Sequence, residues 1–148
     1  MSMALIEEIQ FDSEDYRVVL DWRERILRQP LGLVLSPDDT AGEDGHRHFV
    51  LREKEMILGG VIVMEVDRRT ARLRQMWVRD DLEGKGYGRT LLEAIGRILE
   101  MEGIGRIMLH ARLVVCGFYE KCGYIAEGEI FEEVGIRHIV MSRRLAQD

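Results

Sequence analysis

The chain has 148 residues, a length typical of one domain with its own core, and we expect residues 1–148 to form a single domain. Its net charge of -6 argues against broad binding to nucleic acid or to an anionic membrane surface. Two cysteines without metal-binding spacing, no membrane-length apolar run and no signal-peptide pattern predict a soluble, cytoplasmic protein with no disulfide scaffold.

The first third of the chain predicts a strand, a helix and a long loop. Residues 4–11 are apolar enough for a strand, and Asp12 or Ser13 can cap a helix that continues to about Arg28. Pro30 should end that helix. Residues 31–46 are mostly turn formers, and a loop of this length in a small domain is often functional, so we expect it to shape a binding pocket.

The remaining sequence alternates between strand and helix signals. Three β-rich runs, a short one at 48–52, a long one at 57–66 and a third at 70–78, indicate an antiparallel meander. An amphipathic helix over residues 88–101 follows a glycine-rich turn, and a strand at 106–111 should lie parallel to the strand before that helix. A short helix, 114–121, and two closing strands, 124–131 and 136–142, complete a mixed α/β sheet of order β-α-βββ-α-β-α-ββ.

The glycine-rich turn reads Gly84-Lys85-Gly86-Tyr87-Gly88-Arg89-Thr90. Alternating glycines expose backbone N–H groups at a helix N-terminus, where a phosphate can bind. The spacing does not fit a nucleotide P-loop, and the preceding antiparallel strands do not fit a dinucleotide-binding unit. A pyrophosphate bound on a mixed sheet is the interpretation that remains.

Two motifs make the chain resemble the GNAT superfamily of acetyl-coenzyme A-dependent N-acetyltransferases. The turn Glu83-Gly84-Lys85-Gly86-Tyr87-Gly88 is similar to the superfamily signature Arg/Gln-x-x-Gly-x-Gly/Ala, and Phe118-Tyr119-Glu120-Lys121-Cys122-Gly123-Tyr124 is similar to its Phe-Tyr-x-x-x-Gly-Phe/Tyr element. Glu83 departs from the signature, and its carboxylate should weaken cofactor affinity.

The resemblance implies a fold in which the fourth and fifth strands separate and acetyl-coenzyme A (acetyl-CoA) binds between them, without a metal ion. Carried over to this sequence, it implies that pantetheine bonds to one strand and the diphosphate to the turn, with Arg112 near the cofactor. The implied cofactor-binding residues are Met76, Trp77, Val78, Gly84, Lys85, Gly86, Tyr87, Gly88, Arg89, Thr90 and Arg112.

The implied reaction is direct attack of a neutral amine on the thioester. Tyr119 matches the superfamily tyrosine that gives a proton to the leaving thiolate, although a packing role for this aromatic residue is the alternative. An amine with a pKa of about 10.4 must also lose a proton, and Glu133, His138 and His110 are the candidate bases or substrate contacts. Purely structural roles remain open for each of these three.

The segment Phe131-Glu132-Glu133-Val134-Gly135-Ile136-Arg137-His138 further resembles the ElaA-like branch of the superfamily. His46 and His48 flank Arg47 in a polar stretch and are expected to be solvated rather than to bind a metal. The resemblance also makes a homodimer a candidate assembly, since dimers are common in the superfamily.

The sequence therefore predicts an acetyltransferase acting on a primary amine of a small molecule or a peptide, with no nucleic-acid or membrane partner. A non-catalytic acyl-CoA-binding module on the same fold is the alternative, favoured by Glu83 and opposed by Tyr119. The acidic net charge predicts a weak, long-range preference for cationic acceptors.

Overall fold

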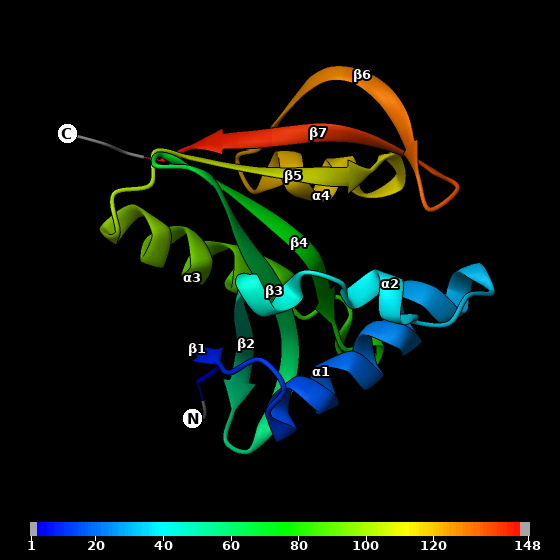
Figure 1. The fold of residues 1–148 in the computed structure, drawn as a ribbon. Helices are drawn as coiled ribbons and strands as arrows, with labels where there is room; N and C mark the ends of the chain where they lie inside the picture. Colours follow the sequence, from blue (N-terminus) through cyan, green and yellow to red (C-terminus); the bar gives the residue numbers. More distant parts are fainter. Residues whose placement is uncertain (1–2, 146–148) are drawn as a thin grey trace.

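The computed structural model describes residues 3–145. It confirms the predicted mixed α/β architecture: a seven-stranded sheet of order β1-β2-β3-β4-β5-β7-β6, with helices on both faces (Figure 1). The strands are β1 (Leu5–Ile9), β2 (Arg47–Glu53), β3 (Met56–Asp67), β4 (Thr70–Val78), β5 (Arg106–Arg112), β6 (Ile125–Glu133) and β7 (Ile136–Arg144). The helices are α1 (Glu14–Arg23), α2 (Pro37–Thr40), α3 (Tyr87–Met101) and α4 (Cys116–Lys121).

Helix α1 begins where the sequence predicted and changes geometry before its end. The Ser13 side chain accepts a hydrogen bond from the Tyr16 backbone N–H, which caps the helix. After Arg23 the chain widens into a π-helical turn, Glu24–Arg28, and then tightens into a 3-10 turn, Gln29–Leu31, that contains Pro30. Such π turns occur frequently at functional sites.

Residues 31–46 are more ordered than the predicted loop. The segment contains α2 and a 3-10 turn, Glu43–Gly45, and the Leu35 backbone N–H donates a hydrogen bond to Glu24 at 3.0 Å. The expectation of a solvated His48 is wrong, because His48 is buried with its Nε2 2.7 Å from the Glu43 carbonyl oxygen. Glu43 of this segment is buried, so the polar composition of the segment does not mean that it is exposed to solvent.

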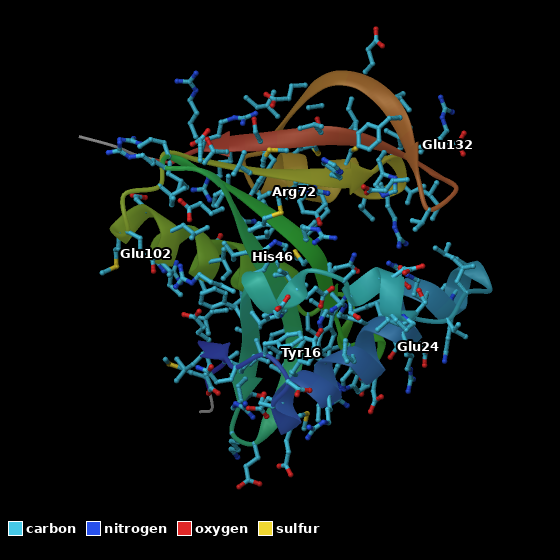
Figure 2. All side chains as sticks on the ribbon, viewed as in Figure 1. Tyr16, Glu24, His46, Arg72, Glu102 and Glu132 are labelled. Atoms are coloured by element: carbon cyan, nitrogen blue, oxygen red, sulfur yellow. The ribbon has the colours of Figure 1, made fainter. Side chains whose placement is uncertain are left out.

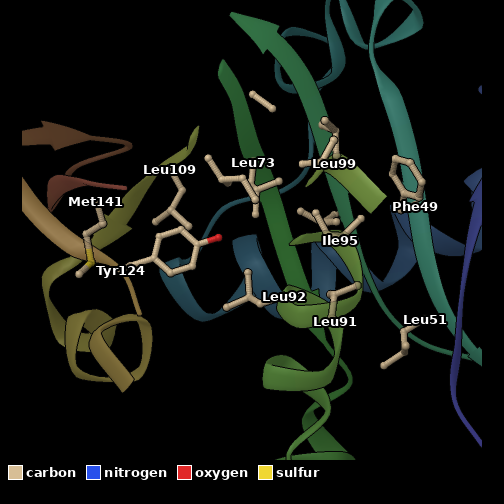
Figure 3. Close-up of a cluster of buried hydrophobic side chains, with 14 of the residues drawn as sticks. Phe49, Leu51, Leu73, Leu91, Leu92, Ile95, Leu99, Leu109, Tyr124 and Met141 are labelled. Carbon is tan, nitrogen blue, oxygen red and sulfur yellow. The ribbon is translucent and has the colours of Figure 1, made fainter. Parts of the chain in front are cut away.

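The meander β2-β3-β4 and the parallel pairing of β4 with β5 are as predicted. Helix α3 packs its apolar stripe against one face of the sheet, where Leu91, Leu92, Ile95 and Leu99 meet side chains such as Leu73 (Figure 3). Helix α1 covers the other face through a smaller cluster that includes Val19 and Trp77. The sheet is thus buried on both sides over its central strands.

Strands β4 and β5 begin side by side and then diverge, as Figure 1 shows. Their pairing runs only from Thr70 with Arg106 to Leu73 with Leu109. Beyond it, β4 carries an extra residue relative to β3, and Gln75 has a left-handed φ of 52°. This bulge turns the end of β4 away from β5 and opens the sheet.

Candidate active site

A cavity of about 660 Å³ lies between the diverging ends of β4 and β5. It runs from the glycine-rich turn before α3 to the β6–β7 hairpin, and the π-helical turn and α4 also contribute to its lining. Its position at a break in strand pairing gives access to strand backbone that no neighbouring strand covers.

The β4 wall of the cavity contains Met76, Trp77 and Val78, the three residues predicted to meet pantetheine. The Trp77 indole is buried and stacked on Trp22, with ring centroids 6.1 Å apart. Glycine at 59 and 60 permits this course of β4, since a Cβ at Gly59 would lie 2.6 Å from the Trp77 carbonyl oxygen. The wall is therefore held in place by close packing on β3.

The glycine-rich turn presents an open backbone surface to the cavity. Gly84 and Gly86 have left-handed φ values of 78° and 84°, and a Cβ on either would meet nothing within 4 Å. Gly86 is the N-cap of α3 and has no side chain to cap the first-turn amides. Exposed amides at a helix N-terminus suit a phosphate, so the turn fits the diphosphate of acetyl-CoA.

Only some of the turn residues that were predicted to bind the cofactor line the cavity. Gly84, Gly86, Tyr87, Gly88 and Arg89 line the cavity, whereas Lys85 and Thr90 do not. The Thr90 hydroxyl donates instead to the Gly86 carbonyl oxygen at 3.0 Å, which stabilises the turn itself.

Charges at the turn partly cancel. Arg89 donates a hydrogen bond to Glu93 at 3.0 Å, one helical turn away. Glu83, an exposed acidic residue, also lines the cavity next to the glycines. An anion bound at the glycine-rich turn would therefore be held by backbone amides more than by side-chain cations.

Tyr119 of α4 lines the cavity beside Met76 of β4, and its hydroxyl is 3.9 Å from the Met76 sulfur. Its ring packs edge-on against Phe118 and Tyr124. Burial raises the pKa of Tyr119 to about 12, despite the opposing charge of Arg112. The phenol is thus protonated at neutral pH and can act as an acid.

The three predicted base candidates come together at the far end of the cavity. His110 Nδ1 lies 3.1 Å from one Glu133 oxygen, and His138 Nε2 lies 3.8 Å from the other. Phe131 packs against both imidazoles. His138 Nδ1 is 2.8 Å from the Ile136 carbonyl oxygen, which only accepts, so this nitrogen carries the proton.

Arg72 is a site residue that the sequence analysis missed, and Figure 2 shows it where β4 diverges from β5. Its Nη2 is 2.9 Å from His110 Nδ1 and 3.8 Å from Glu133 Oε1. His110 Nδ1 can accept from Arg72 or donate to Glu133, but it cannot do both in one tautomer. Strand alternation from the buried Ala71 and Leu73 was the signal that could have placed Arg72 on the cavity side.

Arg112 also lines the cavity, and its Nη2 donates to the Leu27 carbonyl oxygen at 3.3 Å. Leu27 belongs to the π-helical turn, which contributes Ile26, Leu27 and Arg28 to the lining. Within the described part of the chain, residues 31–46 do not line this cavity, contrary to the expectation that the loop shapes it. The segment instead supports the turn, because Asp39 pairs with Arg28 at 3.3 Å.

Residues 35–145 match the family model described as an acetyltransferase (GNAT) domain. The chain belongs to the GNAT acetyltransferase family. This confirms the resemblance drawn from the two motifs, and it makes the protein an acyltransferase with the GNAT fold.

Individual GNAT proteins resemble the chain over nearly its whole length. A candidate acetyltransferase of Bacillus subtilis (strain 168) is 24% identical over 133 residues, covering 88% of this chain and 90% of that protein. Escherichia coli ElaA superposes with a TM-score of 0.78 at 20% identity, covering 95% of this chain and 99% of ElaA. A GNAT family acetyltransferase from Elizabethkingia anophelis, solved with acetyl-CoA bound, gives 0.70 at 14% identity, covering 96% and 98%.

Residues 3–145 contain neither a helix suited to cross a membrane nor a candidate metal site. None of the helices in this range is long and apolar enough to cross a membrane. The same range holds no group of three or more His, Cys, Asp or Glu side chains placed to bind a metal ion.

Proposed function

We propose that this GNAT protein transfers the acetyl group of acetyl-CoA to a primary amine by direct attack. The observation that carries the proposal is the single cavity that joins an amide-lined turn, a protonated tyrosine and a His–Glu cluster. These three parts correspond to cofactor binding, acid and base, the functions that the reaction requires.

The proposed chemistry divides between the two walls of the cavity. His110 or Glu133, held 3.1 Å apart, accepts the proton that the amine loses as its nitrogen bonds to the acetyl carbon. The carbon–sulfur bond then breaks, and the Tyr119 hydroxyl gives its proton to the departing thiolate. Acetyl-CoA supplies the activated acetyl group, and the amides of the Gly84–Gly88 turn hold its diphosphate.

The test is release of free thiol from acetyl-CoA over a broad panel of amines, compared between wild type and Tyr119→Phe. We expect turnover with some amines and a loss of about a hundredfold or more in kcat for the variant. Phe118→Leu, beside Tyr119 but without a hydroxyl to lose, is the matched control for packing.

The alternative function is a non-catalytic acyl-CoA-binding module, which Glu83 in the cavity lining favours. Calorimetric binding of acetyl-CoA without turnover on any amine would support that module. Unchanged turnover in Tyr119→Phe would instead remove Tyr119 as the acid while leaving the transferase in place.

A further inference from the structure

Besides Arg89 of the glycine-rich turn, four arginines line the cavity: Arg28, Arg72, Arg74 and Arg112. Ala71 and Leu73 of β4 are buried in the core against α3, so their neighbours Arg72 and Arg74 project to the opposite face of the sheet. On β5 the buried Leu109 and Ala111 place His110 and Arg112 on that same face. Arg28 of the π-helical turn joins them from above the sheet.

These cations have few opposite charges. Arg28 pairs with Asp39, and Arg72 has Glu133 at 3.8 Å. Arg112 donates only to a neutral carbonyl oxygen, and Arg72 Nε is buried with no partner. Among residues 3–145, the Arg74 side chain has no hydrogen bond or ion pair.

The arginines also act unfavourably on one another. Burial and the charge of Arg74 lower the pKa of Arg72, and burial and the charge of Arg28 lower the pKa of Arg112. A guanidinium stays protonated at neutral pH, so the repulsion persists until an anion is bound. The part of the cavity lined by these arginines therefore favours binding of a negatively charged ligand.

The diphosphate of acetyl-CoA is not the anion that this geometry favours. Arg72 lies six residues before the end of β4, roughly 20 Å along an extended strand from the side where the glycine-rich turn follows. Arg72 is instead next to the candidate base, with Nη2 2.9 Å from His110 Nδ1. An anion bound here would lie beside the reacting amine.

We propose that the acceptor is an amino-acid-like molecule, whose carboxylate is held by the guanidinium groups of Arg72 and Arg74 while its amine faces His110 and Glu133. Planar guanidinium forks match a carboxylate in a bidentate manner. The inference rests on the proposed acetyltransferase function and names its substrate class. It reverses the weak preference for cationic acceptors suggested by the net charge of -6, because the local charge of the cavity is positive.

The test compares amino acids with their carboxamides, which keep the size and lose the charge. We expect kcat/KM for thiol release to be at least tenfold higher with the carboxylate member of the preferred pair. In Arg74→Gln this ratio should fall to within twofold of one, whereas Arg68→Gln, in the exposed turn between β3 and β4, should keep it. The KM for acetyl-CoA should change by less than twofold in both variants.

Carboxamides as active as carboxylates would overturn the inference, as would an Arg74→Gln variant that raises only the KM for acetyl-CoA. Failure of the transferase itself is recognised separately, by calorimetric titration with N-acetyl amino acids and N-acetyl amino acid amides. Selective binding of the acids, lost in Arg74→Gln, would support the anion site even if no amine is acetylated. Equal or absent binding of both would contradict it.

Discussion

Arg23 and Glu43 form a bidentate ion pair from which solvent is fully excluded, with guanidinium nitrogens 2.8 and 2.7 Å from the two carboxylate oxygens. The Tyr16 hydroxyl adds a hydrogen bond to Glu43 Oε1 at 2.7 Å. The pair joins α1 to the segment before β2, and the turn that follows α1 lines the cavity. The buried charges therefore help to position one wall of the site from a distance.

Replacing Glu43 with Gln should destabilise the fold, because it leaves the buried Arg23 charge without its partner. We expect the free energy of unfolding to fall by about 3–5 kcal/mol, measured by urea denaturation. The neighbouring exposed residue provides the control: Asp44→Asn should change it by less than about 0.5 kcal/mol. Equal stability of the two variants would show that the ion pair contributes little.

Acid should weaken the same interaction. Burial alone would raise the pKa of Glu43, but the hydrogen bonds and charge of Arg23, with the Tyr16 hydroxyl, hold it below its ordinary value. A carboxyl group whose pKa is lower in the folded state stabilises the fold when the pH is above its unfolded pKa of about 4.3. This contribution to stability is lost as the pH falls further. Stability measured between pH 7 and pH 3 should therefore decline more steeply in wild type than in Glu43→Gln.

The proposed acid should not limit activity at moderately alkaline pH. With the pKa of Tyr119 raised to about 12, its hydroxyl keeps its proton well above the usual range. Below about pH 11, we expect any alkaline decline in kcat/KM to be the same in wild type and in Tyr119→Phe. A decline near pH 10 that disappears in the variant would contradict the raised pKa.

Single substitutions can test each proposed base separately. Glu133→Gln and His110→Asn should each lower kcat by roughly a hundredfold, since each removes a proton acceptor from the cavity. Glu132→Gln changes the adjacent exposed carboxylate of the same strand, labelled in Figure 2, and should leave kcat within twofold. A full rate in both cavity variants would assign the proton transfer to solvent.

Removing the negative charge from the glycine-rich turn should strengthen cofactor binding. Glu83 lines the cavity beside the amides proposed for the diphosphate, and the repulsion is worth about 1 kcal/mol in a solvated site. Glu83→Gln is therefore expected to lower the Kd for acetyl-CoA roughly fivefold by calorimetry. Glu55→Gln, in the exposed β2–β3 turn, controls for net charge and should have no effect.

Periodicity and turn chemistry were sufficient to predict the sheet and its helices. The β-rich run of residues 70–78 forms β4, and the predicted apolar stripe of α3 is buried against the sheet. Most residues of the two glycine-containing motifs that were predicted to form the site line the cavity, whereas Lys85 and Thr90 do not.

Features that depend on contacts between distant segments were not predictable. Glu43 sits in a polar, turn-rich stretch, and the approach of Arg23 and Tyr16 explains its burial. Strand alternation can place Arg72 on one face of β4, but its partners there are His110 of β5 and Glu133 of β6, which only the fold brings to it. Local patterns carry no record of such partners.

Because the pairing between β4 and β5 breaks, the two halves of the chain each supply one wall of the cavity. Strand β4 supplies one wall before residue 79, and β5, α4 and the β6–β7 hairpin supply the other after residue 105, with α3 as the link. Four residue pairs of parallel ladder fix the angle between these walls. During folding, the proposed acid Tyr119 therefore meets the glycine-rich turn only when the last third of the polypeptide docks onto the first half.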